Sequence, residues 1–186
     1  RVETWELIEP NMKNIRVTMR ARTFWEQRLE VRFRPGEPYL NLIDTANRAL
    51  PQPQKNFGLK IQGSNLCNEI HLATSEDRTA VCCLSSVNVE KFDEWRGSTM
   101  IRDLVRFLDN VLQFFIDNAG DEISRAKYSA QRERSLGLGA MGWHAFLHTN
   151  RIPFESESAQ VWNNVVFQYI QNEAMEESLT MCSPRR

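Results

Sequence analysis

Residues 63–86, GSNLCNEIHLATSEDRTAVCCLSS, contain three of the four cysteines in the chain. Three side chains of different chemistry follow one another at intervals of two: the Asn65 amide, the Cys67 thiol and the Glu69 carboxylate. If this segment is extended, alternate side chains point to one side, and all three face one pocket. Three interpretations are open at this point: a metal site, a structural pair of cysteines, or a catalytic thiol.

The Glu69 carboxylate limits the chemistry that the Cys67 thiol can perform. A negative charge beside a thiol opposes formation of the thiolate, which is the form that a nucleophilic cysteine needs. A neutral thiol can still donate a hydrogen atom or form a radical, while Glu69 acts as a general base on a substrate hydroxyl. Spacing alone favours the simpler alternative, in which Cys67 is a small core residue and Glu69 faces solvent.

Cys67, His71, Cys82 and Cys83 offer a set of possible zinc ligands. Adjacent cysteines rarely ligate one tetrahedral ion together, and the chain has no C-x2-C pair, so the pattern disfavours zinc. A disulfide between the two adjacent cysteines would be strained. If residues 79–87 form a strand, these cysteines face opposite sides, and only one of them can share a pocket with Cys67.

Two further motifs carry weaker signals. Residues 137–142, GLGAMG, lack the Gly-Lys-Ser/Thr of a phosphate loop and follow no clear strand, so we interpret their glycines as sites of close helix packing. His144 and His148 are four positions apart on a predicted helix face, which permits metal binding. No acidic residue lies between them to complete a zinc motif.

Length and composition describe an ordinary globular chain of 186 residues, with 41% hydrophobic and 25% charged residues. The net charge of -1 gives no electrostatic case for binding nucleic acid or a membrane surface. No apolar run approaches the roughly 18 residues of a membrane span. Four unevenly placed cysteines and no signal-peptide segment predict a reducing, cytoplasmic location.

The elements that must position these residues are predicted to be mostly helical. The apolar residues repeat at helical intervals in three long segments: 11–33, 98–118 and 155–181. Ser98 is the predicted N-cap of the second helix, and a further helix is expected within residues 134–150. Short extended segments are predicted at 39–44, 65–72 and 79–87.

Several motifs together resemble one family. SNLCNEI, followed by RTAVCCLSSVNVEKFDEW, strongly resembles the active-site region of the large, catalytic subunit of class I ribonucleotide reductases. GEPYLNLIDTANRA upstream, and RSLGLGAMGWHAFL with RIPFESESA downstream, are similar to the neighbouring segments of that family. The motifs occur in the family's order over residues 20–176, so the resemblance does not depend on any single match.

The resemblance implies a radical site in the SNLCNEI motif. Cys67 matches the cysteine that becomes a thiyl radical and abstracts the ribose 3′ hydrogen. Glu69 matches the general base that takes the 3′-hydroxyl proton. Asn65 matches the amide that binds the ribose hydroxyls, and Ser64 beside it belongs to the substrate-binding positions.

The resemblance also implies a redox-active disulfide. Cys82 matches one of the two cysteines that form a disulfide as the 2′-hydroxyl leaves as water. The matching partner lies upstream of anything in this sequence. Cys83 falls where the family varies, and we interpret it as a bystander.

The implied fold is α/β, an incomplete and helix-rich part of the ten-stranded α/β barrel of ribonucleotide reductases. Residues 1–186 are expected to form a single partial domain without the allosteric cone domain. Tyr39, Tyr128 and Tyr169 do not stand in the pattern of the family's radical-relay pair, and the sequence around Cys182 does not resemble the shuttle cysteines. The chain is therefore similar to a central fragment, either a partial sequence or the product of a split gene.

The implied activity is radical-based reduction of ribonucleoside diphosphates to deoxyribonucleoside diphosphates for DNA synthesis, with the isolated chain expected to be inactive. The implied partners are the remaining segments of the large subunit, a metal-containing small subunit that generates the radical, and thioredoxin or glutaredoxin. No metal is expected in this chain, and the ATP and deoxynucleotide effector sites lie mostly outside it. The alternatives are a non-catalytic binding or scaffold remnant of the same fold and a small zinc-binding module.

Overall fold

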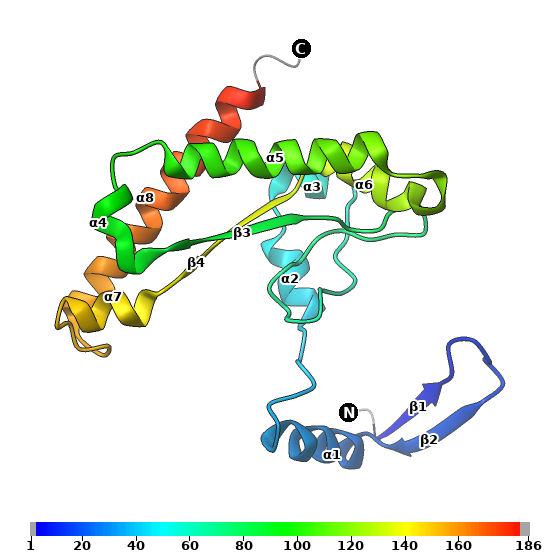
Figure 1. Cartoon of the computed structure of the whole chain (residues 1–186). Coiled ribbons are helices and arrows are strands. Elements are labelled where there is room, and N and C mark those ends of the chain that lie inside the picture. Colours follow the sequence, from blue (N-terminus) through cyan, green and yellow to red (C-terminus); the bar gives the residue numbers. More distant parts are fainter. Residues whose placement is uncertain (1–2, 183–186) are drawn as a thin grey trace. The chain divides into compact units, whose positions relative to one another are not determined.

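The computed structural model describes residues 3–182. The chain divides into two compact units, one made of residues 1–72 and the other of residues 73–186. Figure 1 shows the elements of each unit along the chain. The expectation that residues 1–186 form one partial domain stays a prediction.

The first unit begins with an antiparallel hairpin of β1 (Thr4–Ile8) and β2 (Arg16–Arg20), followed by α1 (Ala21–Phe33) (Figure 1). The register pairs Trp5 with Met19, and the Trp5 ring lies 5.5 Å from the ring of Phe24, centroid to centroid. The prediction of one helix over residues 11–33 is wrong before Ala21. The β-branched Val17 and Thr18 favour a strand once β1 is available as a partner.

Two short helices follow, α2 (Ile43–Ala49) and α3 (Gln52–Asn56). The predicted strand over residues 39–44 is wrong, because α2 begins at Ile43 and the preceding residues have no regular structure. Asp44 lies in the first turn of α2, where a carboxylate interacts favourably with the helix dipole. Residues 59–72 then run largely without regular structure.

One side chain of α2 holds the segment that leads to the cysteine motif. Asn47 Nδ2 donates a hydrogen bond to the carbonyl oxygen of Ile61 at 2.8 Å, and the Ile61 amide donates back to Asn47 Oδ1 at 2.9 Å. Ile61 is buried, with 3% of its surface exposed. Both polar groups of a buried residue are therefore satisfied by one amide side chain.

The second unit contains a parallel pair of strands, β3 (Cys83–Asn88) and β4 (Leu136–Met141), with Cys83 opposite Leu136 in the register. The chain between them forms the helices α4 (Phe92–Trp95), α5 (Met100–Asn118) and α6 (Ser124–Glu133), with 3-10 turns at Val89–Lys91 and Asp121–Ile123. A helical crossover between parallel strands is the basic α/β unit. The predicted strand over residues 79–87 is confirmed from Cys83 onward.

The helices α7 (Trp143–Thr149) and α8 (Glu157–Cys182) complete the second unit. The predicted helices over residues 98–118 and 155–181 are confirmed as α5 and α8. Ser98 is one residue too early to be the N-cap of α5, which is Thr99. The Ser98 hydroxyl nevertheless accepts a hydrogen bond from the Met100 amide at 3.3 Å.

The glycine-rich motif at 137–142 forms β4 and the start of α7, so its interpretation as a site of close helix packing is wrong. A Cβ on Gly137 would lie 2.3 Å from Leu84 Cδ2, on the neighbouring strand. Gly142 has a φ of +79°, and a Cβ there would lie 2.3 Å from Asn88 Oδ1. These glycines therefore allow close strand packing and a left-handed turn into α7.

Two apolar clusters stabilise the second unit. The larger one contains ten buried residues: Val87, Val89, Phe92, Trp95, Ile101, Phe146, Leu147, Ala159, Val166 and Ile170. The smaller one, called here the α5–α6 cluster, contains Leu112, Ile116 and Ala130, with Val81, Cys83, Phe115 and Leu136 packed against it. Both clusters use the inner face of α5.

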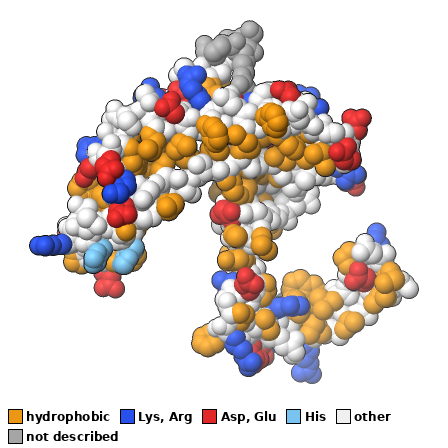
Figure 2. Space-filling model, in the orientation of Figure 1, with side chains coloured by type: hydrophobic (Ala, Val, Ile, Leu, Met, Phe, Trp, Pro, Cys, Tyr) orange, Lys and Arg blue, Asp and Glu red, His pale blue; other side chains and the backbone are white. Residues whose placement is uncertain are grey.

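The outer face of α5 keeps large apolar side chains in solvent. Phe107 and Phe114 are 61% and 70% exposed, and Figure 2 shows hydrophobic side chains gathered along this helix. α1 likewise buries none of its residues. Among residues 3–182, no helix combines the length and the apolar character that crossing a bilayer requires.

We predict that Asn47→Ala lowers the free energy of unfolding by about 2 kcal/mol, because the Ile61 amide and carbonyl are left buried without partners. Chemical denaturation measures the loss, and hydrogen exchange at the Ile61 amide should become faster. Gln52→Ala is the matched control, since the Gln52 side chain donates to the exposed side chain of Asn56. An Asn47→Ala variant as stable as the control would contradict this prediction.

Candidate functional site

The SNLCNEI motif forms a tight turn in the first unit, and not the extended segment that the sequence predicted. The Asn68 amide donates to the carbonyl oxygen of Asn65 at 3.1 Å, which closes the turn around Leu66 and Cys67. Asn68 has a φ of 65°, a left-handed conformation that asparagine tolerates better than most residues. The rule that alternate side chains share a face therefore does not apply here.

Two polar side chains of the motif hold this turn. Asn65 Oδ1 accepts a hydrogen bond from the Ile70 amide at 2.9 Å, so the side-chain oxygen of Asn65 stabilises the turn. The Ser64 hydroxyl lies 2.6 Å from Asn68 Oδ1 and 3.1 Å from the carbonyl oxygen of Asn65. The Asn65 NH2 group has no such task within the turn and can serve as a donor to a ligand.

The reactive groups of the motif lie on the surface of this unit. Cys67 and Glu69 are both exposed, and Cys67 is a free thiol. Ser64 and Asn65 hold the turn, and the turn leaves the Cys67 thiol and the Glu69 carboxylate exposed. The alternative in which Cys67 is a buried core residue does not fit this exposure.

A cavity of about 590 Å³ lies beside the turn, within the first unit. Asn68 of the motif and His71 just after it line the cavity, and Asn41 and Leu50 line it from the preceding segment. Asn41 Oδ1 lies 3.3 Å from His71 Nε2. Sequence reasoning missed Asn41 and Asn47, because single asparagines outside a motif give no signal of what they hold.

Cys82 belongs to the second unit and lies just before β3. Burial raises the pKa of the Cys82 thiol, and the neighbouring Cys83 adds to the shift. Its sulfur lies 3.6 Å from the carbonyl oxygen of Cys83, and a Cβ on Gly137 would approach it to 3.4 Å. The group is therefore a neutral, half-buried thiol at neutral pH.

Cys83 differs from Cys82 in what it contacts. Cys83 packs against the α5–α6 cluster, and burial raises its pKa as well. Cys82 is not among the side chains packed there. These contacts give Cys83 a packing role, and the expectation that only one of the two adjacent cysteines shares a site with Cys67 stays a prediction.

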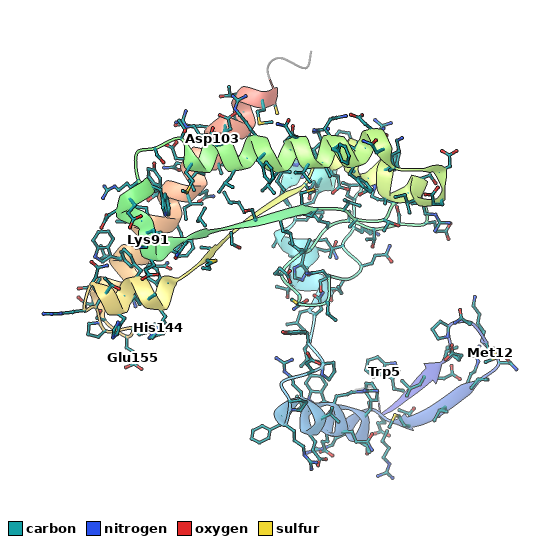
Figure 3. The ribbon with its side chains drawn as sticks, viewed as in Figure 1. Trp5, Met12, Lys91, Asp103, His144 and Glu155 are labelled. Atoms are coloured by element: carbon teal, nitrogen blue, oxygen red, sulfur yellow. The ribbon has the colours of Figure 1, made fainter. Side chains whose placement is uncertain are left out.

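The other candidate ligands do not form a cluster. His144 is exposed on α7, where Figure 3 labels it. Within the described part of the chain, no group of three or more His, Cys, Asp or Glu side chains is arranged to hold a metal ion. Tyr169 has a structural contact, since its hydroxyl accepts a hydrogen bond from the Gly97 amide at 2.7 Å.

Comparison with known proteins identifies the relatives of this chain. A family model described as the barrel domain of ribonucleotide reductase matches residues 2–186. The protein assigned as a ribonucleoside-diphosphate reductase large subunit in Frog virus 3 (isolate Goorha) is 52% identical over 188 residues, which cover 100% of this chain and 33% of that protein. The ribonucleoside-diphosphate reductase large subunit of Invertebrate iridescent virus 3 is 46% identical, with coverage of 91% and 27%.

A solved structure shows the same fold. The Actinobacillus ureae class Id ribonucleotide reductase alpha subunit superposes with a TM-score of 0.82 at 38% identity, over 86% of this chain and 31% of that chain. The chain thus spans 27–33% of the length of these three relatives. The predicted fold class, a helix-rich and incomplete part of an α/β barrel, is confirmed. Because the family model matches residues 2–186, the chain belongs to the family of ribonucleotide reductase barrel domains.

Proposed function

We propose that this chain is the central part of the catalytic barrel of a ribonucleoside-diphosphate reductase large subunit. The observation that carries the proposal is the family match over residues 2–186, together with an exposed free thiol at Cys67 within the SNLCNEI turn. The whole protein would reduce ribonucleoside diphosphates to deoxyribonucleoside diphosphates. Such a reaction supplies precursors for DNA synthesis.

In the proposed reaction, Cys67 acts first. Its thiyl sulfur takes the hydrogen atom from C3′ of the ribose, and the Glu69 carboxylate takes the proton of the 3′-hydroxyl. Ser64 and Asn65 bind the ribose hydroxyls, with the Asn65 NH2 group as the free donor. The exposure of Cys67 supports its proposed role, because the substrate must reach the sulfur directly.

Cys82 supplies reducing equivalents in the proposed second half of the reaction. The 2′-hydroxyl leaves as water, and Cys82 and a second cysteine outside this chain are oxidised to a disulfide. The hydrogen is then returned from Cys67 to C3′. Thioredoxin or glutaredoxin would reduce the disulfide again. The raised pKa of Cys82 supports this role, because a neutral thiol can deliver both hydrogen and electrons.

The proposed partners lie outside the chain. A separate metal-containing small subunit would generate the radical, and ATP and deoxynucleotides would act at effector sites mostly in other parts of the large subunit. The exposed Phe107 and Phe114 of α5 support the need for further segments, because a complete domain rarely leaves such a row in solvent. We propose a cytoplasmic location for the assembled enzyme.

We predict that Cys67→Ser lowers diphosphate reduction by the complete large subunit and its small subunit by about a thousandfold or more, because a serine hydroxyl does not form the required radical. Cys182→Ser is the matched control, since Cys182 is also an exposed free thiol but lies outside the motif. Turnover that survives Cys67→Ser would contradict the proposal. It would favour a binding or scaffold remnant for this chain.

We predict that Glu69→Gln lowers kcat about a hundredfold while substrate binding changes little, because the amide keeps the shape but cannot accept the 3′-hydroxyl proton. Steady-state kinetics separates the two effects. Glu155→Gln is the control, since Figure 3 places Glu155 outside the motif, between α7 and α8. A variant with unchanged kcat would remove Glu69 from the mechanism.

We predict that alkylation of Cys82 follows pH with a midpoint above that of an ordinary cysteine thiol, because burial raises its pKa. The thiol therefore stays protonated over a wider pH range, and its reaction with iodoacetamide rises only at higher pH. Peptide-resolved mass spectrometry at a series of pH values measures the profile. A midpoint at or below that of a short cysteine peptide would contradict the burial argument.

A further inference from the structure

A part-buried ion pair lies at the start of the segment that leads to Cys82. Arg78 Nη1 contacts Glu133 Oε1, and only 11% and 8% of the two side chains are exposed. Glu133 is the last residue of α6, and only residues 79–81 separate Arg78 from Cys82. The pair therefore links the segment before Cys82 to the last residue of α6 through two charged side chains.

The same segment has further contacts with α6. The Arg78 guanidinium carbon lies 5.3 Å from the centre of the Tyr128 ring, and that of Arg132 lies 5.4 Å from the same ring. The Thr79 amide donates to the carbonyl oxygen of Arg125 at 3.3 Å. Contacts at Arg125, Tyr128 and Glu133 therefore follow the length of α6.

The backbone at Arg78 is also fixed locally. The amides and carbonyls of Ser75 and Arg78 exchange two hydrogen bonds, of 3.1 and 3.2 Å, across a tight turn. Arg78 thus joins a closed turn on one side to α6 on the other. The segment from Thr79 to Cys82 therefore begins at a residue that is held on both sides.

On either side of Cys82, two side chains fix its orientation. Val81 and Cys83 both pack against the α5–α6 cluster. Alternation along an extended segment then directs Cys82 to the opposite side. The apolar contacts and the pairing of Cys83 with Leu136 hold Cys82 from its C-terminal side, and the Arg78 contacts hold the same segment from its N-terminal side.

We propose that the Arg78–Glu133 ion pair is a positioning element that fixes where the Cys82 thiol lies relative to α6. An ion pair taken largely out of water often stabilises a fold no better than apolar side chains of similar volume, because desolvation of the charges offsets their attraction. Its directed hydrogen bonds and the planar guanidinium over Tyr128 permit one arrangement of the segment. The functional consequence rests on the proposed redox role of Cys82, whereas the positioning itself does not.

The test is peptide-resolved alkylation with iodoacetamide of the complete large subunit that carries these residues. In Glu133→Gln the Cys82 alkylation rate should rise by at least about fivefold, because the released segment opens locally more often. The rates at Cys83 and Cys67 should stay within about twofold, since Cys83 keeps its packing and Cys67 lies in the other unit. Parallel rises at all three thiols would mean general loosening and would overturn the proposal.

A second variant covers the case in which Glu133→Gln does not fold. Arg78→Lys keeps the charge beside Glu133 but lacks the planar fork, so a smaller rise at Cys82 alone is expected. Glu173→Gln is the matched control, because it breaks the 2.6 Å pair with Arg102 between α5 and α8 of the same unit. A Cys82 rate unchanged in Arg78→Lys, or raised equally in Glu173→Gln, would overturn the proposal.

The outcome is separable from that of the proposed function. Alkylation reports where the thiol lies, whether or not Cys82 takes part in reduction. If Cys82→Ser kept full reductase turnover, the redox assignment would fail and the alkylation result would still stand. If alkylation were insensitive to Arg78 and Glu133, the positioning proposal alone would fail.

Discussion

Two hydrogen bonds between the Asn47 side chain and the backbone of Ile61 fix the point from which the Cys67 turn begins. Residues 59–72 have almost no regular secondary structure, so their polar backbone groups need partners from elsewhere. Asn47 supplies both partners for a residue that is fully buried. The turn that follows can then present an exposed thiol without being itself a part of a helix or strand.

In the second unit, apolar packing holds the segment that carries Cys82. The inner face of α5 covers the parallel strands. Val81 and Cys83 pack against the α5–α6 cluster, to which Leu112 and Ile116 of α5 belong. Both adjacent cysteines are half-buried, and of the two only Cys83 is among the side chains packed against that cluster. In both units, the cysteine that we propose to take part in the reaction is held by contacts of neighbouring residues.

Sequence periodicity predicted the elements in which packing and local preference agree. α5 and α8 repeat apolar residues every three or four positions, and both were found where expected. β4 was missed because it contains Gly137 and Gly139 and is followed by Gly142, and glycine weakens a strand pattern. Residues 16–20 were assigned to a helix because their apolar spacing fits one, and only pairing with β1 decides for a strand.

The site shows a similar division. The motif SNLCNEI and the family could be recognised from residue order, which does not require the conformation. The turn could not, because it depends on a left-handed Asn68 and on the contact between its side chain and Ser64. The supports at Asn47 and Glu133 were also missed, since their partners lie 14 and 55 residues away in the sequence.

In the proposed function, this chain supplies the radical cysteine to a barrel that other segments complete. The most direct measurement is diphosphate reduction after mixing this chain with separately supplied upstream and downstream segments and the small subunit, with demonstrated assembly. The account predicts deoxyribonucleoside diphosphate only in the complete mixture, and none when the chain carries Cys67→Ser. Product formation that does not depend on Cys67, or no product from an assembled complex, would contradict it.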